Sequence, residues 1–282
     1  MIDLHTHTTE SDGRYAPAEL VARASAAGVT VLAVTDHDTV AGCEAVAAGC
    51  AEKGIAFVPG IEITAVRETG DLHVLGYFFD PHAPGLLGFL AEQRRQRVER
   101  IRQMIGKLAA LGIVLDAEQI LRPALDDPKK SAGRPWIARA LLSAGHVSTV
   151  NEAFERWLER GKPAFVSRIG ASTAEVIAQI HGAGGIASLA HPVLMHHDER
   201  IPGLVAEGLD AIEAYHSKHD AATTKHYLGL AATLGVAVSG GSDYHGHETY
   251  GPSRLGSVAL PRDAYERLVM LSQNAARPHG ER

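Results

Sequence analysis

The sequence predicts an α/β protein with a mostly parallel sheet, and three observations support this fold class. Short apolar runs alternate with longer amphipathic runs over most of the chain, and such alternation is typical of parallel sheets. Histidines and carboxylates follow several of the apolar runs. The length of 282 residues and the hydrophobic fraction of 45% allow an α/β barrel built as one full-sized domain.

The first part of the chain alternates strands and helices. The helix expected over 17–28 begins with a proline and ends with a glycine, which are typical start and stop residues. A second helix is expected over 41–54 and also ends at a glycine. Strands are expected over 1–5, 29–38, 55–64 and 72–79.

The alternation stops between roughly 82 and 163. A long helix is expected from Leu86 to about Leu111, ending at Gly112. Further helices are expected near 117–121, 135–144 and 151–160, and no strong strand candidate occurs among them. We therefore expect a helical insertion over 82–163 within a domain formed by 1–81 and 164–282.

After the insertion the alternation resumes. Helices are expected over 172–185, over 221–235 and from Arg262 onward, with strands over 186–192, 209–216 and 236–245.

Composition excludes several classes of protein. The net charge of −6 argues against broad binding of long nucleic acids or acidic membranes. No apolar stretch approaches the roughly 20 residues of a membrane-spanning helix. Cys43 and Cys50 would lie about 10 Å apart on one helix, too far to form a disulfide. Reduced thiols and the lack of a secretory signal pattern predict a cytoplasmic protein, and nothing indicates an obligate protein partner.

Residues that can bind metals follow the predicted strands. In α/β proteins the carboxyl ends of the strands meet at one edge, where active sites form. His5 and His7 are two residues apart on a strand, so they face the same side and can bind one metal ion. The other candidates are His37, Glu62, His191, Asp243 and His245, at or just after strand ends, and His73, within a strand.

Residues near these candidates have simpler expected roles. Asp36 is expected to orient an imidazole, and Asp38 to cap the following helix. The basic run Arg94–Arg102 is expected to be a solvated helix face. His197 follows a candidate ligand in a predicted rim loop and is a candidate for a catalytic or substrate-binding role.

Taken together, the motifs resemble those of the PHP family, named for its polymerase and histidinol phosphatase members. They are "HTHT" with Asp12, "TDHD", "GIE" with His73, "AHP" and "SDYH". The resemblance implies a distorted (β/α)₇ barrel, with the helical insertion capping the active site. It also implies phosphoester hydrolysis with up to three divalent metal ions.

Mixed imidazole and carboxylate ligands suit Mn²⁺, Zn²⁺ or Fe²⁺ better than Mg²⁺ or Ca²⁺, and we favour Mn²⁺. The resemblance assigns the ligands motif by motif. The first metal would take His5, His7, Glu62 and Asp243, the second Glu62, His73 and His191, and the third Asp12, His37 and His245.

A narrower group within the family is similar over more of the chain. The insertion contains "GRPWIARAL" at 133–141 and "RGKPAFV" at 160–166. Both motifs resemble those of 3′,5′-nucleotide bisphosphate phosphatases and of 5′–3′ exonucleases acting on short RNA. Trp136 stands where that group often has histidine, and a tryptophan there could stack on a nucleobase.

We therefore expect a phosphatase that removes the 3′-phosphate of a 3′,5′-bisphosphonucleotide such as pAp, giving AMP and phosphate. A metal-bridging hydroxide is expected to attack phosphorus in line, with Glu62 bridging metals instead of acting as a base. Arg134 and Lys162 are expected to bind phosphate charge, and His197 is a further candidate.

Four alternatives remain. The same site could act as a 5′–3′ exonuclease on very short RNA. A histidinol phosphatase fits the metal motifs but not the insertion motifs. An accessory module with a vestigial site conflicts with the complete ligand set. A broader metallo-amidohydrolase would need a metal-bridging lysine, for which the sequence offers no candidate.

Overall fold

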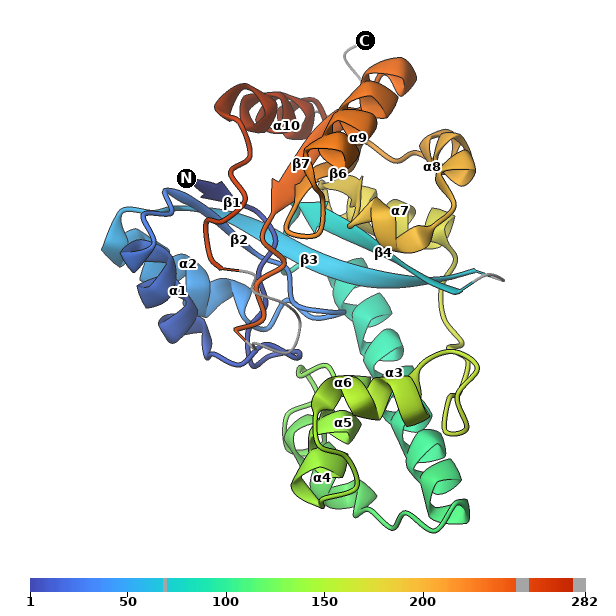
Figure 1. Ribbon diagram of the computed structural model, residues 1–282. Coiled ribbons are helices and arrows are strands. Elements are labelled where there is room, and N and C mark those ends of the chain that lie inside the picture. Colours follow the sequence, from blue (N-terminus) through green and yellow to red (C-terminus); the bar gives the residue numbers. More distant parts are fainter. Residues whose placement is uncertain (68–69, 247–253, 276–282) are drawn as a thin grey trace.

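The computed structural model describes residues 1–67, 70–246 and 254–275, which form an α/β structure around one seven-stranded sheet (Figure 1). The strands are neighbours in chain order. They are β1 (Ile2–Asp3), β2 (Val31–Val34), β3 (Ala56–Arg67), β4 (Gly70–Tyr77), β5 (Ile186–Leu189), β6 (Ala211–His216) and β7 (Ala237–Gly241).

The sheet closes almost completely into a barrel. The backbone N–H of Leu4 donates to the carbonyl oxygen of Gly240 at 3.2 Å, and Thr6 forms a parallel bridge with Tyr244. The first and last strands therefore lie side by side. Buried side chains such as Leu4, Leu75 and Tyr77 fill the interior. The predicted α/β barrel is confirmed.

One strand runs against the others. β4 pairs antiparallel with both β3 and β5, while the remaining pairs are parallel. A parallel connection needs a crossover of about a dozen residues, and only two residues separate β3 from β4. The chain must therefore reverse direction there, which explains why the sheet is mostly, not wholly, parallel.

Helices cover the barrel and build the segment after β4. Those around the barrel are α1 (Pro17–Ala26), α2 (Cys43–Lys53), α7 (Thr173–Gly182), α8 (Ile201–Ala206), α9 (Ala221–Leu234) and α10 (Arg262–Ala275). Those after β4 are α3 (Pro84–Ala110), α4 (Ala117–Asp126), α5 (Arg134–Ser143), α6 (Val150–Ala153) and the π-helix η1 (Phe154–Leu158). The sequence predicted all of these except the short α8.

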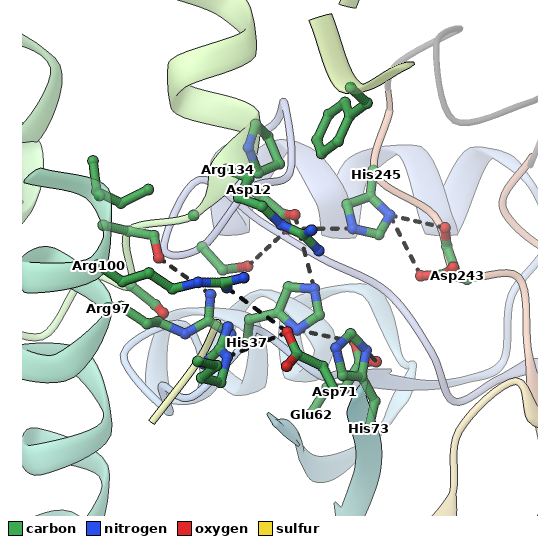
Figure 2. Close-up of a pocket in the computed structure, with 18 of the residues that line it drawn as sticks. Asp12, His37, Glu62, Asp71, His73, Arg97, Arg100, Arg134, Asp243 and His245 are labelled. Carbon is green, nitrogen blue, oxygen red and sulfur yellow. Dashed lines mark hydrogen bonds and ion pairs between the residues drawn. The ribbon is translucent and has the colours of Figure 1, made fainter. Parts of the chain in front are cut away.

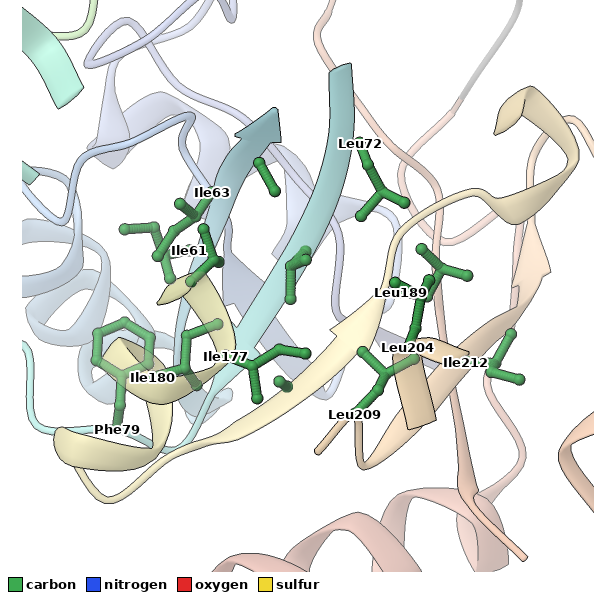
Figure 3. Packing of buried hydrophobic residues seen from close by; sticks show 14 of the residues in the cluster. Ile61, Ile63, Leu72, Phe79, Ile177, Ile180, Leu189, Leu204, Leu209 and Ile212 are labelled. Atoms are coloured by element: carbon green, nitrogen blue, oxygen red, sulfur yellow. The ribbon is translucent and has the colours of Figure 1, made fainter. Parts of the chain in front are cut away.

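The long helix α3 belongs to two hydrophobic cores. Its first turns place Leu86 and Leu90 in the cluster that packs the strands against α7 and α8 (Figure 3). Its last turns place Met104 and Leu108 in a second cluster with α4 and α5. Figure 1 shows α3 running from the sheet to this helical group. That 82–163 acts as a separate cap domain stays a prediction.

The expected helix cap at Asp38 was wrong. α2 begins only at Cys43, with Gly42 at its N-cap. Asp38 has φ of 51°, and its buried carboxylate accepts hydrogen bonds from the Thr64 N–H and the Arg97 side chain. A buried carboxylate needs such partners, so Asp38 connects the strand end to α3 instead of capping a helix.

Candidate metal centre and anion pocket

Glu62, on β3, lies at the centre of the candidate site. Its side chain is 1% exposed. Oε2 lies 3.2 Å from His5 Nε2 and 3.3 Å from His7 Nε2. Oε1 lies 2.6 Å from His73 Nδ1 and 3.0 Å from His191 Nε2. One carboxylate thus touches imidazoles that come from three other parts of the sheet.

Two further carboxylates complete the cluster (Figure 2). Asp243 Oδ1 lies 3.4 Å from His5 Nε2 and 3.3 Å from His7 Nε2. Asp12 Oδ1 lies 3.2 Å from His245 Nε2, and Asp12 Oδ2 lies 3.8 Å from His37 Nε2. The structure therefore brings all nine predicted ligand residues into one connected group.

Their chemistry fits divalent cations. Buried ring nitrogens of His7, His37 and His73 have no hydrogen bond of acceptable geometry among the described residues, although each faces a carboxylate. An unsatisfied buried polar group costs roughly 1–3 kcal/mol, and a shared cation satisfies both partners. Ligand atoms converge in four groups among the described residues: His5, His7, Glu62 and Asp243; His7, Asp12, His37 and His245; His37, Glu62 and His73; and His5, Glu213 and His216. The assignment of ligands to individual metals stays a prediction.

The site holds its carboxylates in the ionised form. Burial alone would raise the pKa of Glu62, but the neighbouring His37 and His73 outweigh burial and hold this pKa well below its usual range. Burial would also raise the pKa of Asp243, but the neighbouring imidazoles, His5 most of all, hold it well below its usual range. The pKa of His7 shows the reverse effect, because hydrogen bonds to Asp243 and Glu62 overcome burial and raise it to about 10. The carboxylates thus supply negative charge for a cation, and a bound cation would displace the proton of His7.

Two of the candidate ligands have strained backbones. His191 has φ of 27° and Asp243 has φ of 52°. Positive φ is uncommon for residues other than glycine, and such strain gathers at functional sites. Each is the second residue after a strand, β5 or β7. His191 faces Glu62, and Asp243 faces His5 and His7.

Four arginines line the same pocket. Arg97 and Arg100 come from α3, Arg134 is the first residue of α5, and Arg168 lies before α7. Asp71 also lines the pocket and lies 3.7 Å from Arg100 Nη1 and 3.5 Å from Arg168 Nε. The pocket therefore joins a carboxylate–imidazole cluster to a group of guanidinium ions.

This arginine group carries excess positive charge. Burial and the neighbouring Arg97 lower the pKa of Arg168 to about 9. Burial and the neighbouring Arg134 lower the pKa of Arg100 to about 10. Arg100 Nη2 is buried without a hydrogen-bond partner among the described residues. An anion bound here would relieve this repulsion and accept charge-assisted hydrogen bonds.

The prediction that Arg94–Arg102 forms a solvated face was wrong for Arg97 and Arg100, which are both 7% exposed. The sequence contained a signal that could have found them. Leu90, Gln93, Arg97, Arg100 and Met104 are three or four residues apart and share one buried helix face. The two arginines fall within the apolar stripe of α3, which turns toward the site.

Of the residues proposed to bind substrate, only Arg134 lines this pocket. Lys162 is exposed in the turn after η1, and Gly161 enters this turn at φ of 82°. His197 is half-buried beside Glu199, whose Oε1 lies 3.0 Å from its Nδ1. The predicted site roles of Lys162 and His197 therefore have no support from the geometry, because surface loops carry both side chains away from the lining.

Two other expectations need correction. Among the described residues Asp36 has no hydrogen bond to an imidazole; it accepts from the Thr8 hydroxyl and the Ser11 hydroxyl, each at 2.6 Å. Its role is to fix the loop that carries Asp12. Trp136 packs against the second core, and its Nε1–H donates to the Ser11 carbonyl oxygen at 3.2 Å. Trp136 supports the same loop and does not line the pocket.

Sequence reasoning also missed Glu213 on β6. It is fully buried, and Oε1 accepts a hydrogen bond from His5 Nδ1 at 2.8 Å. The available signal was a glutamate inside "LDAIEAYH", an otherwise apolar predicted strand. A carboxylate in a buried strand requires a partner.

Comparisons with known proteins agree with this geometry. The PHP domain model matches residues 3–105. A 3′,5′-nucleoside bisphosphate phosphatase from Chromobacterium violaceum is 34% identical over 249 residues, covering 86% of this chain and 87% of the relative. A 5′-3′ exoribonuclease from Haemophilus influenzae is 40% identical over 193 residues, covering 68% of each. A candidate metal-dependent phosphoesterase from Bifidobacterium adolescentis, known from its crystal structure, superimposes with a TM-score of 0.86 at 31% identity, covering 95% of each chain.

Proposed function

Because the chain belongs to the PHP domain family, we propose that it is a metal-dependent phosphatase acting on 3′,5′-bisphosphonucleotides. It would remove the 3′-phosphate of a substrate such as pAp and release AMP and phosphate. The chain covers 87% of the similar bisphosphate phosphatase from Chromobacterium violaceum, which supports this substrate class.

The observation that carries the proposal is the pairing of two kinds of anion site in one pocket. The ligand cluster around Glu62 would hold cations against the reacting phosphate. Arg100 and Arg134 would bind the other phosphate, which the metal centre does not process. A substrate with two phosphates uses both parts, whereas a simple monoester uses only one.

The residues present fit two or more divalent metals, and we propose three, with Mn²⁺ favoured over Zn²⁺ and Fe²⁺. His5, His7, Glu62 and Asp243 would hold the first. His73 and His191, with Glu62, would hold the second, and Asp12, His37 and His245 the third. Bound metals would supply Lewis acidity and an activated water.

The chain's own residues then orient the substrate. Arginine suits a phosphate anchor because its planar fork binds two oxygens at once. Arg97 is neutralised by the buried Asp38, and Arg168 lies near both Asp38 and Asp71. We assign Arg100 and Arg134 as the main anchors, because Arg100 Nη2 is buried without a hydrogen-bond partner among the described residues and Arg134 lines the pocket at the start of α5, and we propose that Arg97 and Arg168 hold the wall of the pocket.

We also propose that the helical segment 82–163 acts as a cap that selects small nucleotides and excludes long nucleic acid. Arg100 and Arg134 reach the pocket from this segment, beside Phe154. We propose a cytoplasmic location. No helix in the described parts of the chain is long and apolar enough to cross a membrane.

A parallel assay tests the function. The purified protein with Mn²⁺ is offered pAp, AMP, histidinol phosphate and a 5′-phosphorylated dinucleotide. We expect the highest kcat/KM for pAp. The similarity to an exoribonuclease makes 5′–3′ cleavage of short RNA the second candidate, and a preference for the dinucleotide would favour it. A preference for histidinol phosphate would contradict both.

A further inference from the structure

Glu213 makes two contacts that point toward the proposed metal centre. Oε1 accepts from His5 Nδ1 at 2.8 Å, and Oε2 accepts from the backbone N–H of His191 at 2.6 Å. An ionised carboxylate can only accept, so His5 carries its proton on Nδ1. His5 Nε2 faces Glu62 and Asp243, 3.2 Å and 3.4 Å away, so with Nδ1 held as the donor to Glu213, Nε2 is the nitrogen that would bind a metal ion. One side chain fixes the tautomer of His5 and the backbone of His191.

An irregularity in β6 places Glu213 and its neighbour His216 behind the site. Glu213 pairs with Ser239 and Tyr215 with Gly240, so Ala214 is an extra residue in the strand. Residues three apart on a regular strand face opposite sides, but a bulge shifts this alternation. Glu213 and His216 are therefore both buried next to the cluster.

His216 lies beside a third ligand, Asp243. Its Nδ1 accepts from the backbone N–H of Lys218 at 3.1 Å, so the proton of the neutral ring is on Nε2. This Nε2 lies 3.5 Å from Asp243 Oδ2. Asp243 Oδ1 is the oxygen that faces His5 and His7. The bulged strand thus supports His5, His191 and Asp243 from behind.

We infer that Glu213 is a positioning residue that holds ligands of two metals at once, an inference that rests on the proposed metal-dependent function. Glu62 faces the Nε2 atoms of His5 and His191, whereas Glu213 accepts from His5 Nδ1 and from the His191 backbone N–H. Only a carboxylate offers two acceptor oxygens here. In glutamine an NH₂ group replaces one of these oxygens, and it would face the N–H of either His5 or His191.

Glu213→Gln should therefore weaken two of the three metal sites together. Groups that orient metal ligands typically contribute about 10–100-fold to affinity. We expect a loss of this size at the sites of His5 and His191. The third site takes Asp12, His37 and His245, whereas the contacts of Glu213 are to His5 and His191, so this site should keep its affinity.

The test is a titration of metal-free protein with Mn²⁺, with free Mn²⁺ measured by its electron paramagnetic resonance signal. Asp210→Asn is a matched control. Asp210 lies just before β6, and its Oδ2 accepts from His181 Nε2 at 2.7 Å and from the Ala187 N–H at 2.8 Å. It thus has the same kinds of partner as Glu213 but is not part of the pocket, and its substitution should leave Mn²⁺ binding unchanged.

The outcomes separate the two proposals. If the wild type binds Mn²⁺ and Glu213→Gln binds it equally, the inference is overturned while the proposed function stands. A uniform loss at all sites, with a lowered melting temperature of the metal-free protein, would also overturn it, because Glu213 would then serve the fold. If the wild type binds no Mn²⁺, both fail. Should Glu213→Gln not fold, Glu213→Asp keeps the charge but draws both oxygens back, and the same selective loss is expected.

Discussion

At the residue scale, Arg134 offers the clearest test of substrate selection. It lines the pocket at the start of α5, where its guanidinium can bind a second phosphate. A hydrogen bond to a charged group contributes about 1.5–3 kcal/mol, or roughly 10- to 150-fold at 1.4 kcal/mol per tenfold. Arg134→Ala should lower kcat/KM for pAp by about this factor. It should hardly affect p-nitrophenyl phosphate, which has no second phosphate.

The exposed Arg95 of α3 provides the control, because it pairs with Glu92 and does not line the pocket. Arg95→Ala should leave both substrates unaffected. Equal losses on both substrates in Arg134→Ala would mean that Arg134 serves the reacting phosphate or the fold. No loss on pAp would assign the anchor to Arg100 instead.

The candidate ligands allow a second test at this scale. His5 Nε2 lies 3.2 Å from Glu62 Oε2 and 3.4 Å from Asp243 Oδ1. His5→Ala or Asp243→Asn should remove a ligand of the first metal and lower turnover by orders of magnitude. Elemental analysis should show less bound metal in both variants. Full activity with unchanged metal content in either variant would remove that residue from the ligand set.

At the element scale, the helical segment supports the loop that carries Asp12. Trp136 Nε1–H donates to the Ser11 carbonyl oxygen at 3.2 Å, and the Ser131 N–H donates to the Glu10 carbonyl oxygen at 2.9 Å. Lys130 Nζ lies 3.2 Å from Glu10 Oε1. The position of a candidate ligand of the third metal thus depends on α5 and on the turn before it.

Trp136→Phe should therefore weaken the third metal site while keeping the packing of the ring. One hydrogen bond contributes about 0.5–1.5 kcal/mol, or roughly 2- to 12-fold in affinity. The measurement is again Mn²⁺ titration of the metal-free protein. Trp157→Phe is the control, because Trp157 Nε1 is buried without a hydrogen-bond partner among the described residues. Equal effects of both substitutions would mean that the indole of Trp136 acts only through packing.

At the scale of the whole molecule, metal binding should stabilise the fold. Three ionised carboxylates and six imidazoles form one cluster, in which Glu62, Asp12 and Asp243 each lie close to an imidazole nitrogen. A ligand at 100 times its Kd stabilises the native state by about 2.7 kcal/mol per site. For a chain of this size each kcal/mol raises the melting temperature by about 2–4 °C.

We therefore expect the melting temperature to fall by roughly 5–10 °C for each site emptied when a chelator removes the metal. Calorimetry with Mn²⁺ and with excess EDTA measures this difference. Asp243→Asn should show a smaller difference than the wild type. A melting temperature that does not depend on metal would contradict the proposed centre.

The sequence by itself determined the α/β class, most of the helices and strands, and the candidate ligands. These features depend on local periodicity and on short motifs near strand ends, such as "HTHT" after β1 and "SDYH" after β7. Both signals are contained within a few residues. They could therefore be read without knowing how distant segments pack.

Only the tertiary structure decided which supporting residues reach the site. Arg100 on α3 and Glu213 on β6 are far apart in sequence, yet both turn toward the same rim. The direction of Arg100 depends on how α3 packs against the barrel, and that of Glu213 on one extra residue in β6. Lys162 shows the opposite case. Its motif predicted a role in phosphate binding, but the turn that contains it leaves its side chain at the surface. Side-chain direction is fixed by packing between elements, which the order of residues along the chain does not specify.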